Sequence, residues 1–115
     1  MTHKYNACKT EVEGILFDSK RESERYRELK LLESAGEISA LRLQPKYLIL
    51  DSFMYRGHKI RETYYIADFE YRGKIIDGAY EIITEDVKGV KTAAFMLKQK
   101  MFKKLYPWID FRIVK

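Results

Sequence analysis

The residues best suited to chemistry in this sequence are an acid and a base two positions apart, Asp86 and Lys88, and a second acid upstream, Asp68. The Asp86–Lys88 pair ends a β-rich segment and directly precedes Gly89. Side chains repeat with a period of two along a strand, so both groups are expected on one face of a sheet. Two carboxylates and a lysine suit a metal-dependent phosphodiesterase, but a surface ion pair would have the same spacing.

Cleavage of a phosphodiester bond requires a divalent metal, an activated water and stabilisation of the charge in the transition state. Mg²⁺ binds proteins through one or two carboxylates and keeps several waters. Asp68 and Asp86 could supply those carboxylates from adjacent strands, and the backbone carbonyl of Val87 could be a further ligand. Lys88 could orient the attacking water or stabilise negative charge. The expected cofactor is therefore Mg²⁺ or Mn²⁺.

A third carboxylate, Glu22, could reach the same site from the start of a helix. Ser19-x-x-Glu22 has the form of a capping box, and Gly36 is a natural stop for the helix. Helical periodicity places Glu22 on the same face as Tyr26 and Leu29. Glu22 could hold a metal-bound water, or it could serve only to close the capping box.

Glu85 is the residue that could be mistaken for the metal ligand. In a strand over residues 79–87, alternation places Asp86 and Lys88 on one face and Glu85 on the other. We therefore favour Asp86 over Glu85 as the ligand.

The wider pattern is that of a mixed α/β domain with a central sheet. Gln44-Pro45 begins an extended run, and Asp68 interrupts an apolar one, where a carboxylate needs a partner or a metal. The expected elements are an extended segment within residues 1–17, a helix from residue 19 to about 35, strands within 47–55, 60–71 and 79–87, a helix over 92–106 and a strand over 109–114. This order of helix, three to four strands, helix and strand predicts a single domain over residues 1–115.

The second expected helix carries much of the basic charge. The formal net charge of the chain is +5, and no carboxylate occurs between Asp86 and Asp110. Lys98 is expected in the middle of the apolar face, where it either snorkels outward or reaches the acidic site. The candidate DNA-binding lysines are Lys91, Lys100, Lys103 and Lys104. A solvated helix face would have a similar composition.

The single cysteine, Cys8, excludes an internal disulfide and is typical of a reducing compartment. Cys8 and His3 lack a second pair of ligands, so no zinc site is expected. No apolar run is long enough to cross a membrane, and the N-terminal residues lack the apolar region of a signal peptide. We expect a cytoplasmic protein.

The order Glu22, Asp68, Asp86-x-Lys88 resembles the PD-(D/E)xK nuclease superfamily. Four motifs are similar to those of a small phage and prophage family placed in that superfamily: Phe17-Asp18-Ser19-Lys20-Arg21-Glu22, Gln44-Pro45, Tyr65-Ile66-Ala67-Asp68-Phe69 and Glu85-Asp86-Val87-Lys88-Gly89. Ala67 stands where the superfamily's motif has proline.

The resemblance implies a restriction-endonuclease-like core, related to those of junction resolvases and transposase endonucleases, with a mixed sheet flanked by helices. It implies a Mg²⁺-dependent DNA nuclease. By matching position, Asp68 and Asp86 would be metal ligands, Lys88 catalytic and Glu22 supporting.

The function expected from these observations is a phage endonuclease for structured or branched DNA, acting in recombination, replication or packaging. No sequence-reading motif such as a helix-turn-helix is visible, which favours structure-directed or partner-directed cutting over base readout. Junction resolvases work as dimers because two strands are cut symmetrically, so a homodimer is expected. The alternative is a non-catalytic DNA-binding or assembly protein on a nuclease-like fold. A third possibility is a structural protein in which Asp68, Asp86 and Lys88 form a buried ion network.

Overall fold

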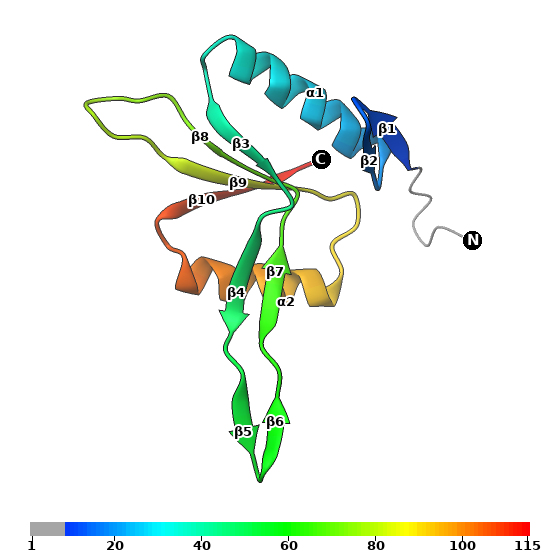
Figure 1. The fold of residues 1–115 in the computed structure, drawn as a ribbon, viewed down its shortest axis with the longest axis vertical. Coiled ribbons are helices and arrows are strands. Elements are labelled where there is room, and N and C mark those ends of the chain that lie inside the picture. The colour runs from blue at the N-terminus through cyan, green and yellow to red at the C-terminus, as the bar shows by residue number, and fades with distance from the viewer. Residues whose placement is uncertain (1–8) are drawn as a thin grey trace.

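The structure, a computed structural model, describes residues 9–115. The predictions about His3 and Cys8 lie outside the described residues. Within that range, two helices cover the two faces of a sheet, and a two-stranded ribbon extends away from this body (Figure 1). Neither of these helices is long and apolar enough to cross a membrane.

The described elements form a mixed α/β domain. In chain order they are β1 (Thr10–Val12), β2 (Ile15–Phe17), α1 (Lys20–Ser34), β3 (Ser39–Leu43), β4 (Lys46–Leu50), β5 (Phe53–Tyr55), β6 (His58–Ile60), β7 (Thr63–Ile66), β8 (Phe69–Arg72), β9 (Ile82–Val87), α2 (Ala93–Leu105) and β10 (Ile109–Val114). The four-stranded sheet has the order β10-β9-β8-β3. Only β9 and β10 are parallel neighbours, and α2 provides the crossover that a parallel pair requires. The predicted α/β class and mixed sheet are confirmed.

Helix α1 begins and ends as the sequence predicts. The Ser19 hydroxyl accepts a hydrogen bond from the Glu22 amide at 3.1 Å, which is the first half of a capping box. At the other end, Gly36 has a φ of +78°. The Glu37 amide donates to the Leu32 carbonyl at 2.9 Å, and this bond closes the helix in a Schellman motif.

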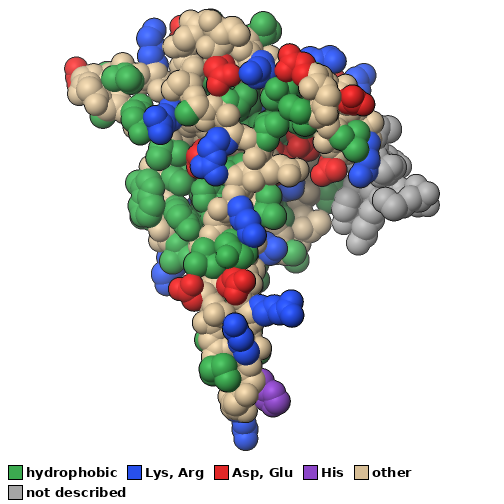
Figure 2. Space-filling model, in the orientation of Figure 1, with side chains coloured by type: hydrophobic (Ala, Val, Ile, Leu, Met, Phe, Trp, Pro, Cys, Tyr) green, Lys and Arg blue, Asp and Glu red, His purple; other side chains and the backbone are tan. Residues whose placement is uncertain are grey.

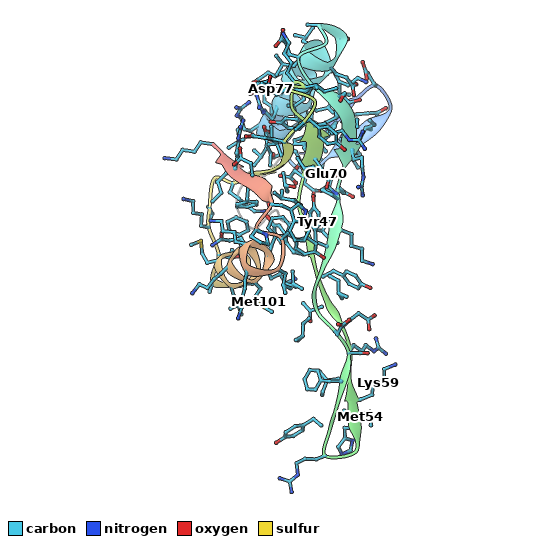
Figure 3. The ribbon with its side chains drawn as sticks, turned by 90° about the vertical axis from the view of Figure 1, so that its left-hand side faces the viewer. Tyr47, Met54, Lys59, Glu70, Asp77 and Met101 are labelled. Atoms are coloured by element: carbon cyan, nitrogen blue, oxygen red, sulfur yellow. The ribbon has the colours of Figure 1, made fainter. Side chains whose placement is uncertain are left out.

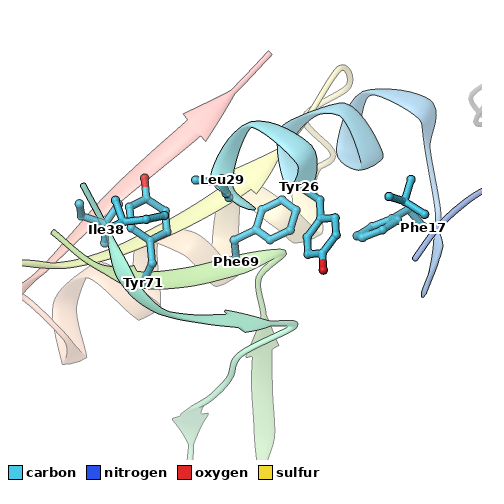
Figure 4. Close-up of a cluster of buried hydrophobic side chains, with 8 residues drawn as sticks. Phe17, Tyr26, Leu29, Ile38, Phe69 and Tyr71 are labelled. Carbon is cyan, nitrogen blue, oxygen red and sulfur yellow. The ribbon is translucent and has the colours of Figure 1, made fainter. Parts of the chain in front are cut away.

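The apolar face of α1 packs on one face of the four-stranded sheet (Figure 4). Leu29 and Phe69, from the helix and from β8, are both fully buried in this contact. The complete cluster of buried side chains is Val12, Phe17, Tyr26, Leu29, Ile38, Phe69, Tyr71 and Ile83. Truncation of a fully buried side chain of this kind typically costs about 2–5 kcal/mol, so this cluster fixes the helix on the sheet.

A largely buried ion pair joins α1 to β9 of the same sheet. Arg25 of α1 donates from Nε and Nη2 to the two carboxylate oxygens of Glu85, both at 2.7 Å. The Tyr71 hydroxyl also donates to Glu85, whose side chain is fully buried. The hydrogen bonds to Glu85 raise the pKa of the Arg25 guanidinium above its ordinary value. Glu85 is therefore neutralised on the α1 face of the sheet.

Helix α2 packs on the opposite side, against strands β4 and β7 and the other face of the sheet. Its buried residues are Phe95, Gln99 and Phe102. The sequence placed Lys98 at the centre of this face, and that placement is wrong: Lys98 is half-buried at its edge. The reason is that Phe95 and Phe102 both pack on Tyr65, which turns the residue between them, Gln99, inward.

The sequence also underestimates the number of strands between the two helices. It predicts three to four, whereas the structure divides this part of the chain into β3 to β9. One reason is a bend in a long hairpin, where the Gln44 amide donates to the Asp68 carbonyl at 2.9 Å and the Ala67 amide to the Pro45 carbonyl at 3.1 Å. Beyond the bend, β4 pairs with β7 and β5 with β6, and these pairs form the ribbon.

The Arg25–Glu85 pair gives a stability prediction. Arg25→Ala leaves the Glu85 carboxylate buried without its guanidinium, and such a loss costs about 3–5 kcal/mol of unfolding free energy. Arg21→Ala is the matched control, because the Arg21–Glu28 ion pair is exposed and is expected to contribute less than about 1 kcal/mol. Urea unfolding of both variants measures the difference. Equal, small losses would contradict a structural role for the buried pair.

Candidate active site

The four residues singled out in the sequence meet at one end of the sheet. Asp86 lies near the end of β9 and Lys88 just beyond it, whereas Asp68 lies at the bend between β7 and β8. Glu22, in the first turn of α1, is close enough for Asp68, Asp86 and Lys88 all to affect its pKa. We refer to Glu22, Asp68, Asp86 and Lys88 as the candidate site.

Asp86 is the most buried member of the site, with a residue exposure of 1%. One of its carboxylate oxygens, Oδ2, accepts a hydrogen bond from the Tyr65 hydroxyl. The other, Oδ1, lies 3.2 Å from Lys88 Nζ. It has no partner in hydrogen-bonding geometry within residues 9–115. Asp86 therefore offers one oriented oxygen and one oxygen held only by an ion pair.

Lys88 shares the face of Asp86, as strand alternation predicts. Its Nζ atom lies 5.0 Å from the centroid of the Phe95 ring of α2. A cation over an aromatic face is attracted to it, so Phe95 and Asp86 together orient the ammonium group. The side chain of Lys88 retains 32% of its exposure, which leaves it accessible to a ligand from solvent.

Asp68 is placed by the bend in the hairpin and does not lie inside a strand. Its amide donates to the Glu85 carbonyl at 3.1 Å, and its Oδ2 accepts from the Val87 amide at 2.7 Å. These two bonds fix Asp68 beside the last residues of β9. The sequence analysis expected a partner for the Asp68 carboxylate, and the structure provides the Val87 amide. The Val87 carbonyl as a metal ligand stays a prediction.

Burial and mutual repulsion change the acidity of two of the carboxyl groups. The pKa of Asp68 is raised to about 8, first by burial and then by the negative charges of Asp86 and Glu22. The pKa of Glu22 is raised to about 7 by burial, Asp18 and Asp86, against the lowering effect of Lys88. The candidate site therefore contains three carboxyl groups for one ammonium group. Such an excess is relieved by bound protons or by a cation.

The donor set fits a hard divalent cation that retains part of its water. Mg²⁺ prefers oxygen ligands and is commonly bound by one or two carboxylates, and Asp68 and Asp86 can supply them. Within residues 9–115, no group of three or more His, Cys, Asp or Glu side chains is arranged to hold a metal ion. A metal ion held by Asp68 and Asp86, with Glu22 acting through a bound water, stays a prediction.

Two polar side chains, one bound to the candidate site and one buried in α2, were not predicted as functional. Tyr65 was expected only as a strand residue, yet its hydroxyl binds Asp86. Gln99 is buried, and its Oε1 has no hydrogen-bond partner within the described part of the chain. Its Nε2 donates to the Met96 carbonyl at 3.2 Å. A signal for Gln99 was present in the sequence, as a polar residue midway between Phe95 and Phe102 on one helical stripe.

The candidate DNA-binding lysines are exposed on and just before α2. They are Lys91, Lys100, Lys103 and Lys104. Lys103 lies with its Nζ atom 5.4 Å from the Phe111 ring centroid. Lys98 is half-buried and takes part in none of the ion pairs found within residues 9–115. Its role, like that of the exposed lysines, stays a prediction.

Comparison with protein families gives one match. A family model described as "Protein of unknown function (DUF1064)" matches residues 2–115. Comparisons with curated proteins and with solved structures yield no match.

The raised pKa values predict how stability changes with pH in protein freed of metal by EDTA. The ordinary pKa values are 4.5 for Glu22 and 3.8 for Asp68, and the folded values are about 7 and about 8. The folded state therefore binds more protons than the unfolded state between about pH 4 and about pH 8. In that window these groups lower the unfolding free energy as the pH rises.

Asp68→Asn removes one of these carboxyl groups, so its stability relative to the parent should increase from about pH 5 to about pH 8. Urea unfolding at both pH values measures this difference. The matched control is Asp77→Asn, at an exposed turn position with φ +52° that asparagine also tolerates. A difference between Asp68→Asn and the parent that does not change with pH would contradict the raised pKa.

Proposed function

We propose a nuclease function for this chain, which belongs to the DUF1064 family of proteins of unknown function. The proposed activity is the hydrolysis of phosphodiester bonds in DNA with Mg²⁺ or Mn²⁺ as cofactor. The observation that carries the proposal is that Asp68, Asp86, Lys88 and Glu22 converge at one end of the sheet, while Glu85 is neutralised on the opposite face.

The architecture supports the proposal. Around the four-stranded sheet the chain runs through α1, β3, β8, β9, α2 and β10, which is helix, three strands, helix and strand. This is the order that the resemblance to PD-(D/E)xK nucleases implies. A restriction-endonuclease-like core is therefore part of the proposal.

Charge balance favours a functional site over a purely structural ion network. The Glu85–Arg25 pair shows how this protein neutralises a buried carboxylate for structure, with a bidentate guanidinium and a tyrosine hydroxyl. The candidate site has one ammonium group for three carboxyl groups, two of which have raised pKa values. Such an arrangement is costly to fold and is typical of sites that bind a cation or a proton.

In the proposed mechanism, Asp68 and Asp86 would hold the metal ion. When bound, the ion supplies Lewis-acid activation of the phosphate and lowers the pKa of a bound water. Tyr65 orients Asp86 through Oδ2. Lys88, at 3.2 Å from Asp86 Oδ1, stabilises the negative charge that develops on the phosphate or orients the attacking water. Glu22 would hold that water and accept its proton.

The substrate and the biological setting extend the proposal. The lysines of α2 supply a cationic surface for the phosphate backbone of DNA. We propose structured or branched DNA as the substrate, with a role in phage recombination, replication or packaging in the host cytoplasm. A homodimer would allow symmetric cutting of two strands. The alternative of a non-catalytic DNA-binding or assembly protein retains the cationic surface but leaves the convergent carboxyl groups without a purpose.

Removal of either proposed catalytic group should abolish cleavage. Asp86→Asn and Lys88→Ala are each expected to lower the cleavage rate by about a hundredfold or more. The assay is Mg²⁺- or Mn²⁺-dependent cutting of linear duplex, flap, four-way junction and single-stranded DNA, with EDTA as the metal-free control. Asp77→Asn should cut like the parent, because Asp77 is exposed in a turn. If Asp86→Asn cuts as fast as the parent, the assigned site is wrong.

The lysines of α2 should contribute to binding but not to the chemical step. Replacement of Lys100, Lys103 and Lys104 by alanine should weaken DNA binding and reduce the slope of log affinity against log salt by about 2–3, since each phosphate contact contributes about 0.9. Fluorescence anisotropy with Ca²⁺ in place of Mg²⁺ measures this slope. An unchanged slope would show that DNA does not contact this surface.

A further inference from the structure

The outer part of the ribbon has no core beneath it. Here we call residues 51–62 the outer ribbon; it contains β5, β6 and the turn between them. Every residue of β5 and β6 is exposed, including Phe53 at 45%, Met54 at 64% and Tyr55 at 59%. Figure 1 shows this segment extending well beyond the body of the molecule. Two strands alone are marginally stable, so the exposed apolar and aromatic side chains suggest a surface for a partner.

The two faces of the outer ribbon differ in chemistry. Phe53 pairs with Ile60 and Tyr55 with His58, and cross-strand pairs share a face. This face is therefore aromatic and apolar. The other face carries the pair Met54 and Lys59 (Figure 3).

The outer ribbon carries two exposed acids at its base, Asp51 and Glu62, and only positive charge beyond them. Arg56, Lys59 and Arg61 lie between Asp51 and Glu62, and no carboxylate lies between those two acids. None of the three cations takes part in an ion pair found within residues 9–115. Figure 2 shows Lys and Arg side chains along the projecting segment. Cations without ion pairs on one face and in the turn, with exposed aromatic rings on the other face, suit a polyanion that also presents flat apolar surfaces.

A second copy of the chain is a poorer partner for this segment. Two outer ribbons packed against each other would bring their arginines and lysines together, and like charges across an interface are costly. Duplex DNA has the opposite charge, and its major groove admits a two-stranded ribbon. The observations therefore favour DNA as the occupant.

The base of the ribbon is also the candidate site. Tyr65 of β7 binds Asp86, and Asp68 follows β7 at the bend. Gly57 at the tip lies eleven positions before Asp68, which corresponds to a reach of at most roughly 36 Å. This is close to one helical turn of B-DNA, about 34–36 Å. DNA in contact with the tip can thus pass the candidate site within about one turn.

We propose that the outer ribbon is a DNA-binding arm that contacts duplex DNA within about one helical turn of the position of cleavage. Arg56, Lys59 and Arg61 contact phosphates, and Phe53 and Tyr55 pack against sugars and base edges in the groove. The inference rests on the proposed nuclease function and adds a requirement for duplex DNA beyond the cut. DNA too short to reach the arm binds through the body alone.

The test compares two variants that lose the same positive charge. The arm variant is Arg56→Asn/Lys59→Gln/Arg61→Gln. Asparagine suits position 56, because the Arg56-Gly57 turn has positive φ at both residues and Asn-Gly favours such hairpin turns. The control variant is Arg27→Gln/Lys30→Gln/Lys74→Gln, whose side chains lie on α1 and in the β8–β9 connection. Thermal unfolding checks that both variants remain folded.

Binding of the full chain to labelled duplexes of about 10 and about 25 base pairs is measured with Ca²⁺ replacing Mg²⁺. The parent and the control variant should bind the longer duplex about tenfold more tightly, and the arm variant should lose most of this gain. Its salt slope on the longer duplex should fall by about 2–3. Cleavage of the shorter duplex should be unchanged in the arm variant, because the candidate site is intact.

A second variant separates the aromatic contribution from the charge. Phe53→Ser/Tyr55→Ser should weaken binding of the longer duplex while leaving the salt slope unchanged, because stacking and packing release no counterions. This result supports a DNA contact by the aromatic face. If the arm variant also loses the tighter binding of the longer duplex, both faces of the outer ribbon contact DNA.

The outcomes that overturn the arm differ from those that overturn the nuclease. If the parent cuts DNA and the arm variant binds and cuts both duplexes like the parent, the arm is wrong and the nuclease function stands. If the parent neither binds nor cuts any DNA, both proposals fall. The proposal is also overturned if the arm variant binds DNA like the parent but no longer forms a dimer that the parent forms in sedimentation, because the outer ribbon then serves self-association. It is likewise overturned if the variant loses only binding to anionic lipid vesicles, because the outer ribbon then contacts a membrane surface.

Discussion

Strand β9 buries two consecutive carboxylates, and the two faces of the sheet satisfy them in opposite ways. Glu85 points to α1, where Arg25 neutralises it with two hydrogen bonds of 2.7 Å. Asp86 points to α2, where it meets a tyrosine hydroxyl and a lysine beside further carboxyl groups. The first arrangement holds a helix on the sheet. The second stores negative charge that a cation can relieve, so one strand contributes both to the stability of the fold and to its candidate site.

The bend at Gln44-Pro45 and Ala67-Asp68 connects that site to the rest of the molecule. It ends the pairing of β3 with β8 and begins the ribbon, and the Asp68 amide and carboxylate both bind β9 at this point. A straight hairpin would continue the alternation of its strands and leave Asp68 within the sheet. Because the chain bends here, a carboxylate, the tyrosine that orients Asp86 and the base of the projecting ribbon all lie together. The bend thus places the candidate site next to the base of the ribbon that we propose as a DNA-binding arm.

The sequence alone was sufficient wherever the deciding interactions are local. The limits of α1 follow from Ser19 and Gly36, whose cap and stop act within a few residues. The strand over residues 109–114 follows from its own alternation and is observed as β10. The choice of Asp86 over Glu85 for the candidate site also follows from a local rule, because neighbouring residues in a strand face opposite ways. Glu22, Asp68 and Lys88 were identified by spacing and resemblance, and the structure brings them together with Asp86.

Contacts between distant segments decided the remaining features. The sequence suggested Lys98 for the centre of the packed face of α2, but Phe95 and Phe102 dock on Tyr65 and turn Gln99 inward. The same contacts make Tyr65 a partner of Asp86, from a strand 21 residues earlier. The composition of residues 53–60 shows that strands form, but not that they lack a core beneath them. Periodicity fixes which side chains share a face, whereas only the packing of elements far apart in the chain determines what that face meets.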